Sequence, residues 1–252
     1  MPTASAVDVM SDEVTGLEAV TFDFWNTLVA EGVAGSDRGR RWHAILAGHG
    51  LDVTDEQLAA ALEASWKWFD RRWRAGTVVA THEAVAVAVG HLPVEVPPPV
   101  RDELAEVVVR GADPADMVVA PGIGDSLERL SSAGVRIGII CDVGLTPSVT
   151  LRSYLDHHGL LRYFDHWSFS DEVGAYKPDR VMFDHAARGL GDPAPERTAH
   201  VGDLLRTDVA GARSAGWISV RYRGLADDVG DEAPEADVVV DHHEDLPRRL
   251  GL

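Results

Sequence analysis

One stretch near the N-terminus decides the fold of this chain: Ala19-Val20-Thr21-Phe22-Asp23-Phe24-Trp25-Asn26-Thr27-Leu28-Val29. The apolar and β-branched residues up to Phe22 predict a buried strand, and Asn26 favours a turn after it. A parallel strand presents the residues that follow it at the carboxyl edge of its sheet, where open α/β folds bind ligands. We therefore expect Asp23 at that edge, with the hydroxyl of Thr27 four residues on.

A carboxylate at the end of a strand has two interpretations. It can be a nucleophile or a metal ligand, and in aspartyl-phosphate chemistry it is both. The more common role of such an aspartate is to form a turn or to cap a helix. The rest of the chain decides between them, because three later segments carry matching polar residues to the ends of other strands.

After Pro121 the chain alternates between helix and strand patterns. The expected helices cover residues 122–133, 147–160, 179–190, 208–215 and 246–250, and the expected strands cover 135–140, 167–170, 198–201, 217–222 and 238–240. Such alternation predicts a parallel sheet wrapped by helices, which is an α/β fold.

The segment between the first strand and this alternating region has a helical pattern. Candidate helices cover 36–48, 54–74, 81–89 and 100–110, and the second begins with a Thr54 cap and Gln57 three residues later. We therefore expect a helical insert at residues 31–120, over a core of residues 1–30 and 121–252. An insert after the first strand lies over the carboxyl edge of the sheet, where a lid would act.

Composition excludes several classes of function. The chain has 252 residues, of which 45% are hydrophobic and 25% charged, as in soluble globular proteins. A net charge of −18 argues against nucleic-acid binding, because affinity for the phosphate backbone comes from Lys and Arg. A single cysteine, Cys141, excludes an intrachain disulfide and favours a reducing compartment, so we expect a cytoplasmic protein. We expect no signal peptide and no membrane partner, since no stretch has the required apolar length.

The first two of the later segments follow expected strands. One strand ends in Cys141 and Asp142 before a glycine turn, where side chains and backbone N–H groups can meet an anion. A structural turn with a buried thiol is the simpler account of Cys141 alone. Lys177 precedes Pro178 in a loop at the start of a helix. Most lysines are solvated surface charges, but one held beside carboxylates at the sheet edge can bind phosphate.

The third segment contains two carboxylates. A strand ends at Gly202-Asp203, and Asp208 opens the next helix. Asp208 could be only a helix cap, whereas Asp203 lies at the strand tip with another carboxylate near it. A few oxygen ligands of this kind suit Mg²⁺, which keeps several waters and takes other ligands from a substrate.

Together these segments resemble, in order, the four motifs of the haloacid dehalogenase-like hydrolase superfamily: Asp23…Thr27, the strand ending at Cys141, Lys177-Pro178 and Gly202-Asp203…Asp208. The resemblance spans most of the chain, and the helical insert matches members with a helical cap of the C1 type. It implies a Rossmann-like core with three α/β/α layers, Mg²⁺ as cofactor and a covalent aspartyl intermediate. A small phosphorylated molecule is the implied partner, and a monomer or homodimer the expected assembly.

The resemblance also implies a role for each matching residue. Asp23 is the nucleophile, and Thr27 and Lys177 hold the nucleophile and the phosphate in position. The metal is bound by Asp203, with Asp208 in support, and by the backbone carbonyl of Trp25. Cys141 completes the catalytic motifs, and Asp142, Arg38, Trp25 and Lys177 are the candidates for substrate binding.

Two positions depart from the family pattern. Family phosphatases usually carry a second aspartate two residues after the nucleophile as general acid, and here that position is Trp25, which cannot transfer a proton at neutral pH. The second motif normally ends in Ser or Thr, and here it ends in Cys141, a weaker hydrogen-bond donor. The dehalogenases of the family also lack that second aspartate, but they lack the metal carboxylates too, which this chain retains.

Three functions therefore remain open. The metal carboxylates favour a Mg²⁺-dependent phosphomonoesterase. Trp25 favours a dehalogenase or another carbon-centred hydrolase. The third alternative is a catalytically weak binding or scaffold protein. Arg38, Arg41 and His43 are candidates for groups that reach the site from the insert, although a solvated helix surface is the simpler account. Trp66, Trp68 and Trp73 could line a substrate pocket, but packing of the insert is favoured for Trp66 and Trp73, which share an apolar helix face.

Overall fold

The computed structural model describes residues 16–32, 37–228 and 234–252. Its main sheet has six parallel strands in the order β5-β4-β1-β6-β7-β8. These strands are β1 (Ala19–Phe22), β4 (Arg136–Cys141), β5 (His166–Phe169), β6 (Thr198–Gly202), β7 (Ile218–Tyr222) and β8 (Val238–Val240). Phe22, the last residue of β1, pairs in register with Ile139 of β4 and Val201 of β6. The ends of these three central strands therefore meet at one edge, as expected for an α/β fold.

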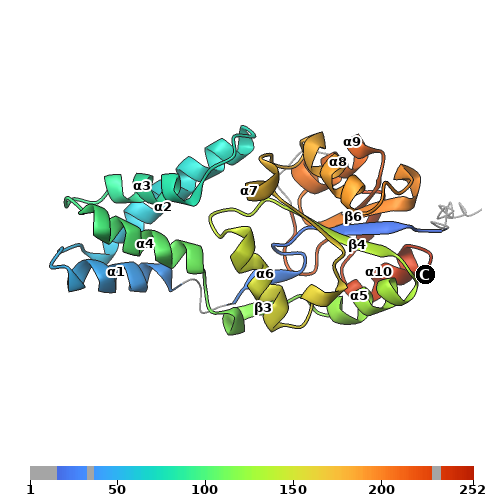
Figure 1. Ribbon diagram of the computed structural model, residues 1–252, viewed down its shortest axis with the longest axis horizontal. Helices are drawn as coiled ribbons and strands as arrows, with labels where there is room; N and C mark the ends of the chain where they lie inside the picture. The colour runs from blue at the N-terminus through green and yellow to red at the C-terminus, as the bar shows by residue number, and fades with distance from the viewer. Residues whose placement is uncertain (1–15, 33–36, 229–233) are drawn as a thin grey trace, which may run out of the picture.

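Helices cover both faces of this sheet (Figure 1). The helices are α5 (Ile123–Ser132), α6 (Ser148–His157), α7 (Ser170–Val173), α8 (Arg180–Gly189), α9 (Ala210–Ala215) and α10 (Leu246–Arg249). Short 3₁₀ turns lie at Pro114–Asp116, Leu161–Tyr163, Pro195–Arg197 and His243–Asp245, and a π-helical turn, η4, at Leu205–Val209. Sequence analysis placed a helix start at Asp208. The structure instead has the π turn before it, in which the Val209 N–H donates to the Leu204 carbonyl (3.2 Å) and the Leu204 N–H donates to Asp208 Oδ2 (3.0 Å).

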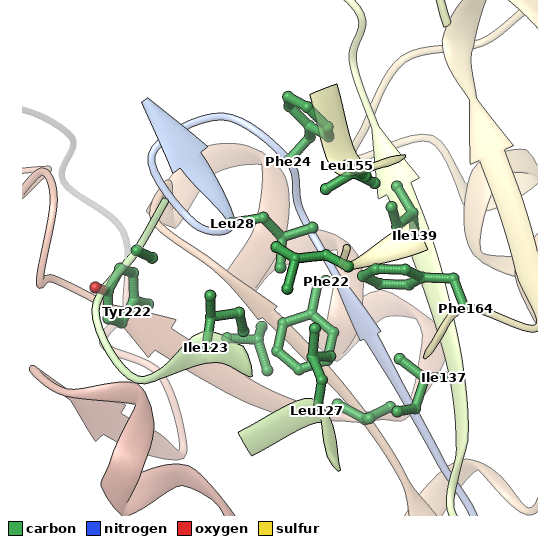
Figure 2. Packing of buried hydrophobic residues seen from close by; sticks show 14 of the residues in the cluster. Phe22, Phe24, Leu28, Ile123, Leu127, Ile137, Ile139, Leu155, Phe164 and Tyr222 are labelled. Atoms are coloured by element: carbon green, nitrogen blue, oxygen red, sulfur yellow. The ribbon is translucent and has the colours of Figure 1, made fainter. Parts of the chain in front are cut away.

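Successive side chains of the central strands point to opposite faces, and each face has its own apolar core. Ile137 and Ile139 of β4 pack with Phe22, Leu127 and Leu155 on one face (Figure 2). Ile140 packs on the other face with Met182 and Phe183 of α8, Ala212 of α9 and Trp217, the residue before β7. The near-continuous apolar run of β4 thus reflects burial on both faces. The predicted three-layer Rossmann-like core is confirmed.

Between β2 (Val29–Glu31) and β3 (Met117–Val119) lie four helices: α1 (Arg38–Gly48), α2 (Asp55–Arg74), α3 (Thr81–Gly90) and α4 (Pro98–Arg110). They pack around a separate apolar cluster that includes Trp42, Leu46, Leu58, Val85 and Leu104. Figure 1 shows them together at one end of the molecule. The expected start of the first helix at Ser36 lies outside the described residues.

The second helix begins as its sequence predicts. The Gln57 N–H donates to Thr54 Oγ1 (3.2 Å), and the Thr54 N–H donates to Gln57 Oε1 (2.9 Å). This reciprocal pair of bonds satisfies two backbone donors that a helix start would otherwise leave free.

The sequence patterns did not predict the short helix α7, which follows β5 directly, or the antiparallel ribbon of β2 and β3. Val29 pairs with Val119 and Glu31 with Met117, across nearly ninety residues of chain. Short strands with so distant a partner carry almost no local pattern. Met117 and Ala120 pack in the core cluster rather than among the insert helices, whose last residue is Arg110. In the described part of the chain, no helix is both long and apolar enough to cross a membrane.

Candidate active site

A cavity of about 480 Å³ lies at the edge where β1, β4 and β6 end. Asp23, Lys177 and Asp203 line it from the sheet side, and Trp66, Phe69 and Trp73 of α2 line it from the insert. The cavity therefore joins the strand ends that sequence analysis singled out to the helical insert.

Asp23 follows β1 directly. Its backbone N–H donates to the Val201 carbonyl (2.8 Å), which extends the sheet pairing by one residue and fixes the aspartate against β6. The residue is only 6% exposed, and its carboxylate forms a short ion pair with the ammonium of Lys177. Burial raises the pKa of Asp23 to about 7, although the nearby Lys177 charge acts in the opposite direction.

Lys177 is the buried cation of the site. Its Nζ donates to Asp208 Oδ1 (2.6 Å) as well as to Asp23, and its backbone N–H donates to Asp142 Oδ1 (2.9 Å). Burial alone would lower the pKa of Lys177, but the carboxylates of Asp208 and Asp23 outweigh it and hold that pKa well above its usual value. Lys177 is therefore a permanent positive charge between two carboxylates.

Asp208 is held from three sides. Besides Lys177, it accepts hydrogen bonds from the Leu204 backbone N–H (3.0 Å) and from Nε2 of His200 (3.0 Å). Burial opposes its ionisation, but Lys177 and His200 favour the charged form more strongly, so the pKa of Asp208 falls below its usual value. Nδ1 of His200 is hydrogen-bonded to the Thr21 hydroxyl (2.8 Å), and burial lowers the pKa of this histidine. His200 is thus a neutral donor that fixes the position of Asp208.

Asp203 lies at the end of β6 and is 3% exposed. Burial, followed by the charges of Asp23 and Asp208, raises the pKa of Asp203 to about 8. Nδ2 of Asn26 donates to Asp203 Oδ2 (3.4 Å). Asn26 has a φ of 56°, and asparagine tolerates this left-handed conformation better than most residues. The predicted turn at Asn26 therefore also brings its amide to the metal-binding candidate.

Three carboxylates meet at this point. Asp23, Asp203 and Asp208 can each offer one oxygen, and these atoms lie within 4.8 Å of one another. When all three ionise, the single charge of Lys177 leaves an excess of negative charge, and the raised pKa values of Asp23 and Asp203 reflect it. A divalent cation would remove this excess, and an all-oxygen donor set suits Mg²⁺. The residues present therefore fit the cofactor that the motifs imply.

The second motif and the glycine turn after it contribute Asp142, Val143 and Gly144 to the cavity. Asp142 lines it, and Asp142 Oδ2 accepts a hydrogen bond from the Trp73 indole N–H (2.8 Å). Cys141 is fully buried at the end of β4 and is absent from the described cavity lining. Burial raises the pKa of its thiol well above the usual value, so Cys141 carries no charge at neutral pH.

Thr27 does not reach the cavity surface formed by the described residues. It is fully buried, its carbonyl accepts a hydrogen bond from His243 Nε2 (2.8 Å), and among those residues its hydroxyl has no partner. Thr207 has an equally buried hydroxyl without a partner in the same set, yet it does line the cavity. Sequence analysis missed Thr207, although its place between Asp203 and Asp208 could have indicated it.

The insert contributes aromatic rings to the cavity. Sequence analysis favoured packing for Trp66 and Trp73, and this is wrong for Trp66, which is 57% exposed and lines the cavity. Its ring stacks on that of Phe69 at 5.4 Å between centroids. Trp73 lines the cavity too, and the Arg206 guanidinium lies 4.3 Å from its ring centroid. Trp25 adds a ring from the core, packed edge-on against Phe24 (5.0 Å).

Of the cationic candidates on α1, only Arg38 lines the cavity. Burial lowers its pKa, and the nearby Glu31 acts in the opposite direction. Arg41 pairs with Asp37 (2.7 Å) and donates to the Gly111 carbonyl (3.1 Å), and His43 lies 3.4 Å from Asp55, so neither is among the described residues that line the cavity.

Comparisons with known proteins agree with this geometry. Residues 17–216 match the sequence profile of the haloacid dehalogenase-like hydrolase family. A glyceraldehyde 3-phosphate phosphatase of Methanopyrus kandleri is 33% identical over 52% of this chain and 54% of its own length. An (S)-2-haloacid dehalogenase of a Pseudomonas species is 25% identical over 69% of this chain and 70% of its own. The chain thus spans about half the length of the first of these curated relatives.

Solved structures agree on the fold. A haloacid dehalogenase-type phosphatase from Thermococcus onnurineus superposes with a TM-score of 0.65 over 93% of this chain and 98% of its own, at 24% identity. The profile match covers the first strand, the insert and all four motifs. This chain is therefore a member of the haloacid dehalogenase-like hydrolase family.

Proposed function

We propose that this protein is a Mg²⁺-dependent phosphomonoester hydrolase that acts through an aspartyl-phosphate on Asp23. The observation that carries the proposal is the cluster of Asp23, Asp203 and Asp208, in which Lys177 pairs with Asp23 and Asp208, and Asp23, Lys177 and Asp203 line the cavity. A displacement of halide from carbon needs no divalent cation. A phosphoryl group brings negative charge to the site, and a cation held by these carboxylates would neutralise that charge.

Each residue of the cluster has a role in this chemistry. Asp23 and Asp203 would hold Mg²⁺, with Asp208 in support and the Trp25 carbonyl as a further ligand; when bound, the ion neutralises charge on the phosphoryl oxygens. A carboxylate oxygen of Asp23 attacks phosphorus, and the bond from phosphorus to the ester oxygen breaks. Lys177 orients Asp23 and faces the developing charge. Water then cleaves the acyl phosphate and regenerates the carboxylate of Asp23.

Trp25 distinguishes this site from one with a built-in acid. It occupies the position two residues after the nucleophile and lines the cavity, so no carboxyl proton is available there for the leaving oxygen. Loss of such an acid costs about 10²–10⁴ in rate for a poor leaving group. The proton must then come from solvent or from the substrate itself.

The helical insert is the second part of the proposal. We take residues 31–120 as a cap over the core, since α2 and Arg38 complete the cavity wall. The catalytic candidates of the four motifs lie outside this insert, so the insert governs substrate choice rather than the chemical step. The single, buried Cys141 fits a reducing compartment such as the cytoplasm.

One specific observation keeps a dehalogenase as the second candidate. Trp25 replaces the acid, and a relative with 25% identity over 69% of this chain is named as a haloacid dehalogenase. A halide ion leaves without protonation, so such a reaction would tolerate Trp25. It would have no use for the carboxylate pair of Asp203 and Asp208.

Metal dependence separates the two candidates. Phosphorylated metabolites and 2-haloacids are assayed with Mg²⁺ and with EDTA, using wild type, Asp203→Asn and Asp156→Asn. Asp156 is exposed on α6, so the last variant matches the charge change away from the cavity. We expect phosphate release that EDTA and Asp203→Asn abolish and Asp156→Asn leaves intact. Turnover of haloacids that is unchanged in EDTA would replace this proposal with the dehalogenase.

A further inference from the structure

A second cavity lies inside the insert. It has about 500 Å³, and its apolar walls come from all four insert helices: Trp42, Leu62, Ala84, Val85, Ala88 and Val108. Arg38, Trp66 and Leu145 line this cavity and the first one alike. The two spaces therefore adjoin along a shared wall, with the catalytic carboxylates at the far side of the first.

Two polar side chains of the second cavity, Ser65 and Glu63, are already engaged. The Ser65 hydroxyl donates to the Ala84 carbonyl (2.7 Å), and Glu63 pairs with Lys67 (2.7 Å). Arg38 lies at the junction, where Glu31 is its nearby opposite charge. A polyhydroxylated ligand would find few free partners here and would lose hydrogen bonds to water without replacing them.

The first cavity is also mainly apolar beyond its floor. The rings of Trp25, Trp66, Phe69 and Trp73 form its walls. Trp66 is 57% exposed, and a solvent-exposed tryptophan ring beside a cavity offers a flat apolar surface to a ligand. Apolar walls with a few placed polar groups are typical of sites for small organic molecules.

A glycine keeps the second cavity open. Gly39 lies in the first turn of α1, where glycine is a poor helix former, and it lines the cavity. A Cβ atom at Gly39 would meet only Leu62 Cδ1, at the ordinary contact distance of 3.9 Å. A larger side chain is therefore sterically allowed at the backbone, and its absence leaves space between α1 and α2.

We infer that the substrate is the phosphate monoester of an apolar alcohol, whose organic group passes the aromatic walls of the first cavity and enters the second. This inference rests on the proposed phosphatase function. Phosphate binds at Asp23 and Lys177, and the apolar group extends past Trp66 into the insert. Sugar phosphates and nucleoside monophosphates lack the apolar extension that would fill this space.

A chain-length series tests the inference. The n-alkyl phosphates from ethyl to decyl differ little in leaving-group pKa, so their rates isolate the contribution of the organic group. We expect kcat/KM to rise about fourfold for each methylene that becomes buried, and then to level off. Oligo(ethylene glycol) monophosphates of matched length are the substrate control, and they should show no such rise. The Kd values of alkylphosphonates, measured by quenching of tryptophan fluorescence, should follow the same trend without turnover.

Two matched variants locate the effect. Gly39→Leu fills the second cavity and should flatten the chain-length series. Gly48→Leu makes the same change near the end of the same helix, where an added Cβ meets nothing within 4 Å, and should leave the series steep. Ala88→Met fills the cavity from α3 and provides a second test, with helix content by circular dichroism as the folding control.

The outcomes separate the two proposals. Release of phosphate from phenyl phosphate with equal kcat/KM for ethyl and decyl phosphate would overturn this inference alone. So would a steep series in Gly39→Leu and Ala88→Met, or faster turnover of sugar phosphates than of hexyl phosphate. No release from any ester would overturn the proposed function together with the inference.

Discussion

The carboxyl edge of the sheet and the helical insert form opposite walls of one cavity, and they are built differently. On the sheet side, Asp23, Lys177 and Asp208 are buried and held by one another and by backbone groups. On the insert side, Trp66 and Trp73 present broad rings, and one of them is more than half exposed. Under the proposed function, we expect the chemistry to depend on the buried, hydrogen-bonded wall and the choice of substrate on the aromatic wall.

The two walls also differ in energetic terms. A buried charge network is stable only while its members are paired, because removal of one partner leaves an uncompensated buried charge. The aromatic wall is less constrained, since loss of the Trp66 ring removes mainly contact area and loss of the Trp73 ring removes contact area and one hydrogen bond. Changes on the sheet side should therefore affect the chemical step severely, and changes on the insert side should affect affinity mildly.

The largest effect is expected for Asp23→Asn. An amide cannot serve as the nucleophile, so kcat should fall more than about 10⁴-fold. Asp70→Asn is the matched control in the insert, where Asp70 pairs with Arg74 on the surface of α2, and it should retain kcat within about twofold. Comparable losses of kcat in the two variants would contradict the proposal that the chemical step depends on the sheet side of the cavity and not on the insert.

The next effect concerns Trp25, which belongs to the sheet side but carries an aromatic ring. Trp25→Asp restores a carboxyl group beside the leaving oxygen and should raise kcat/KM for alkyl phosphates up to about 10²-fold more than for aryl phosphates. The measurement is the slope of log kcat/KM against leaving-group pKa, which should become shallower in the variant. Equal slopes in a folded, metal-binding variant would show that the proton comes from another group.

The pH dependence of stability should report on the crowded carboxylates. In the metal-free protein the pKa values of Asp23 and Asp203 rise to about 7 and about 8, from 3.8 for a solvated aspartate. The folded state then holds protons that the unfolded state has lost, so stability falls as pH rises towards 8. Histidines with lowered pKa values act oppositely, but their effect fades above pH 6.5, so the carboxylates dominate the window from 6.5 to 8.

We expect the melting temperature in EDTA to fall by about 2–6 °C across that window. Saturating Mg²⁺ should remove the decline, because the cation favours the ionised carboxylates. Asp203→Asn should weaken it, since an amide does not titrate. A melting temperature that rises with pH in EDTA would contradict the raised pKa values.

The smallest effect is expected at the contact between the walls. Trp73→Phe keeps a ring but loses the hydrogen bond to Asp142, so it should raise KM about three- to tenfold with little change in kcat. Trp68→Phe, on the same helix and absent from the described cavity lining, is the control and should change neither constant. A larger effect on kcat than on KM would show that Trp73 contributes to the chemical step, like the residues on the sheet side, rather than to substrate binding.

The same comparison explains which features could be predicted from the sequence. The strands and the residues at their ends follow from local patterns, because β1 and β4 are largely apolar runs that end before Asp23 and at Cys141, and β6 ends in the Gly202-Asp203 pair that is typical of a strand end and turn. The capping box at Thr54 is equally local.

Features that depend on distant partners were not predictable. Trp66 has the helical spacing of a packed residue, but its exposure depends on where the sheet edge lies relative to α2. The pairing of β2 with β3 joins segments far apart in the chain. The hydrogen bond from His200 to Asp208 needs the π turn that carries Asp208 back towards β6.

The central claim is that Asp23 is covalently phosphorylated during turnover. Its direct test is to quench the reaction of phenyl phosphate with Mg²⁺ in acid, reduce the trapped acyl phosphate with borohydride, and map the product by peptide mass spectrometry. The claim predicts homoserine at position 23, in amounts that depend on substrate and Mg²⁺ and vanish in Asp203→Asn. Phosphate release with position 23 recovered only as aspartate, or with the modification on another residue, would contradict it.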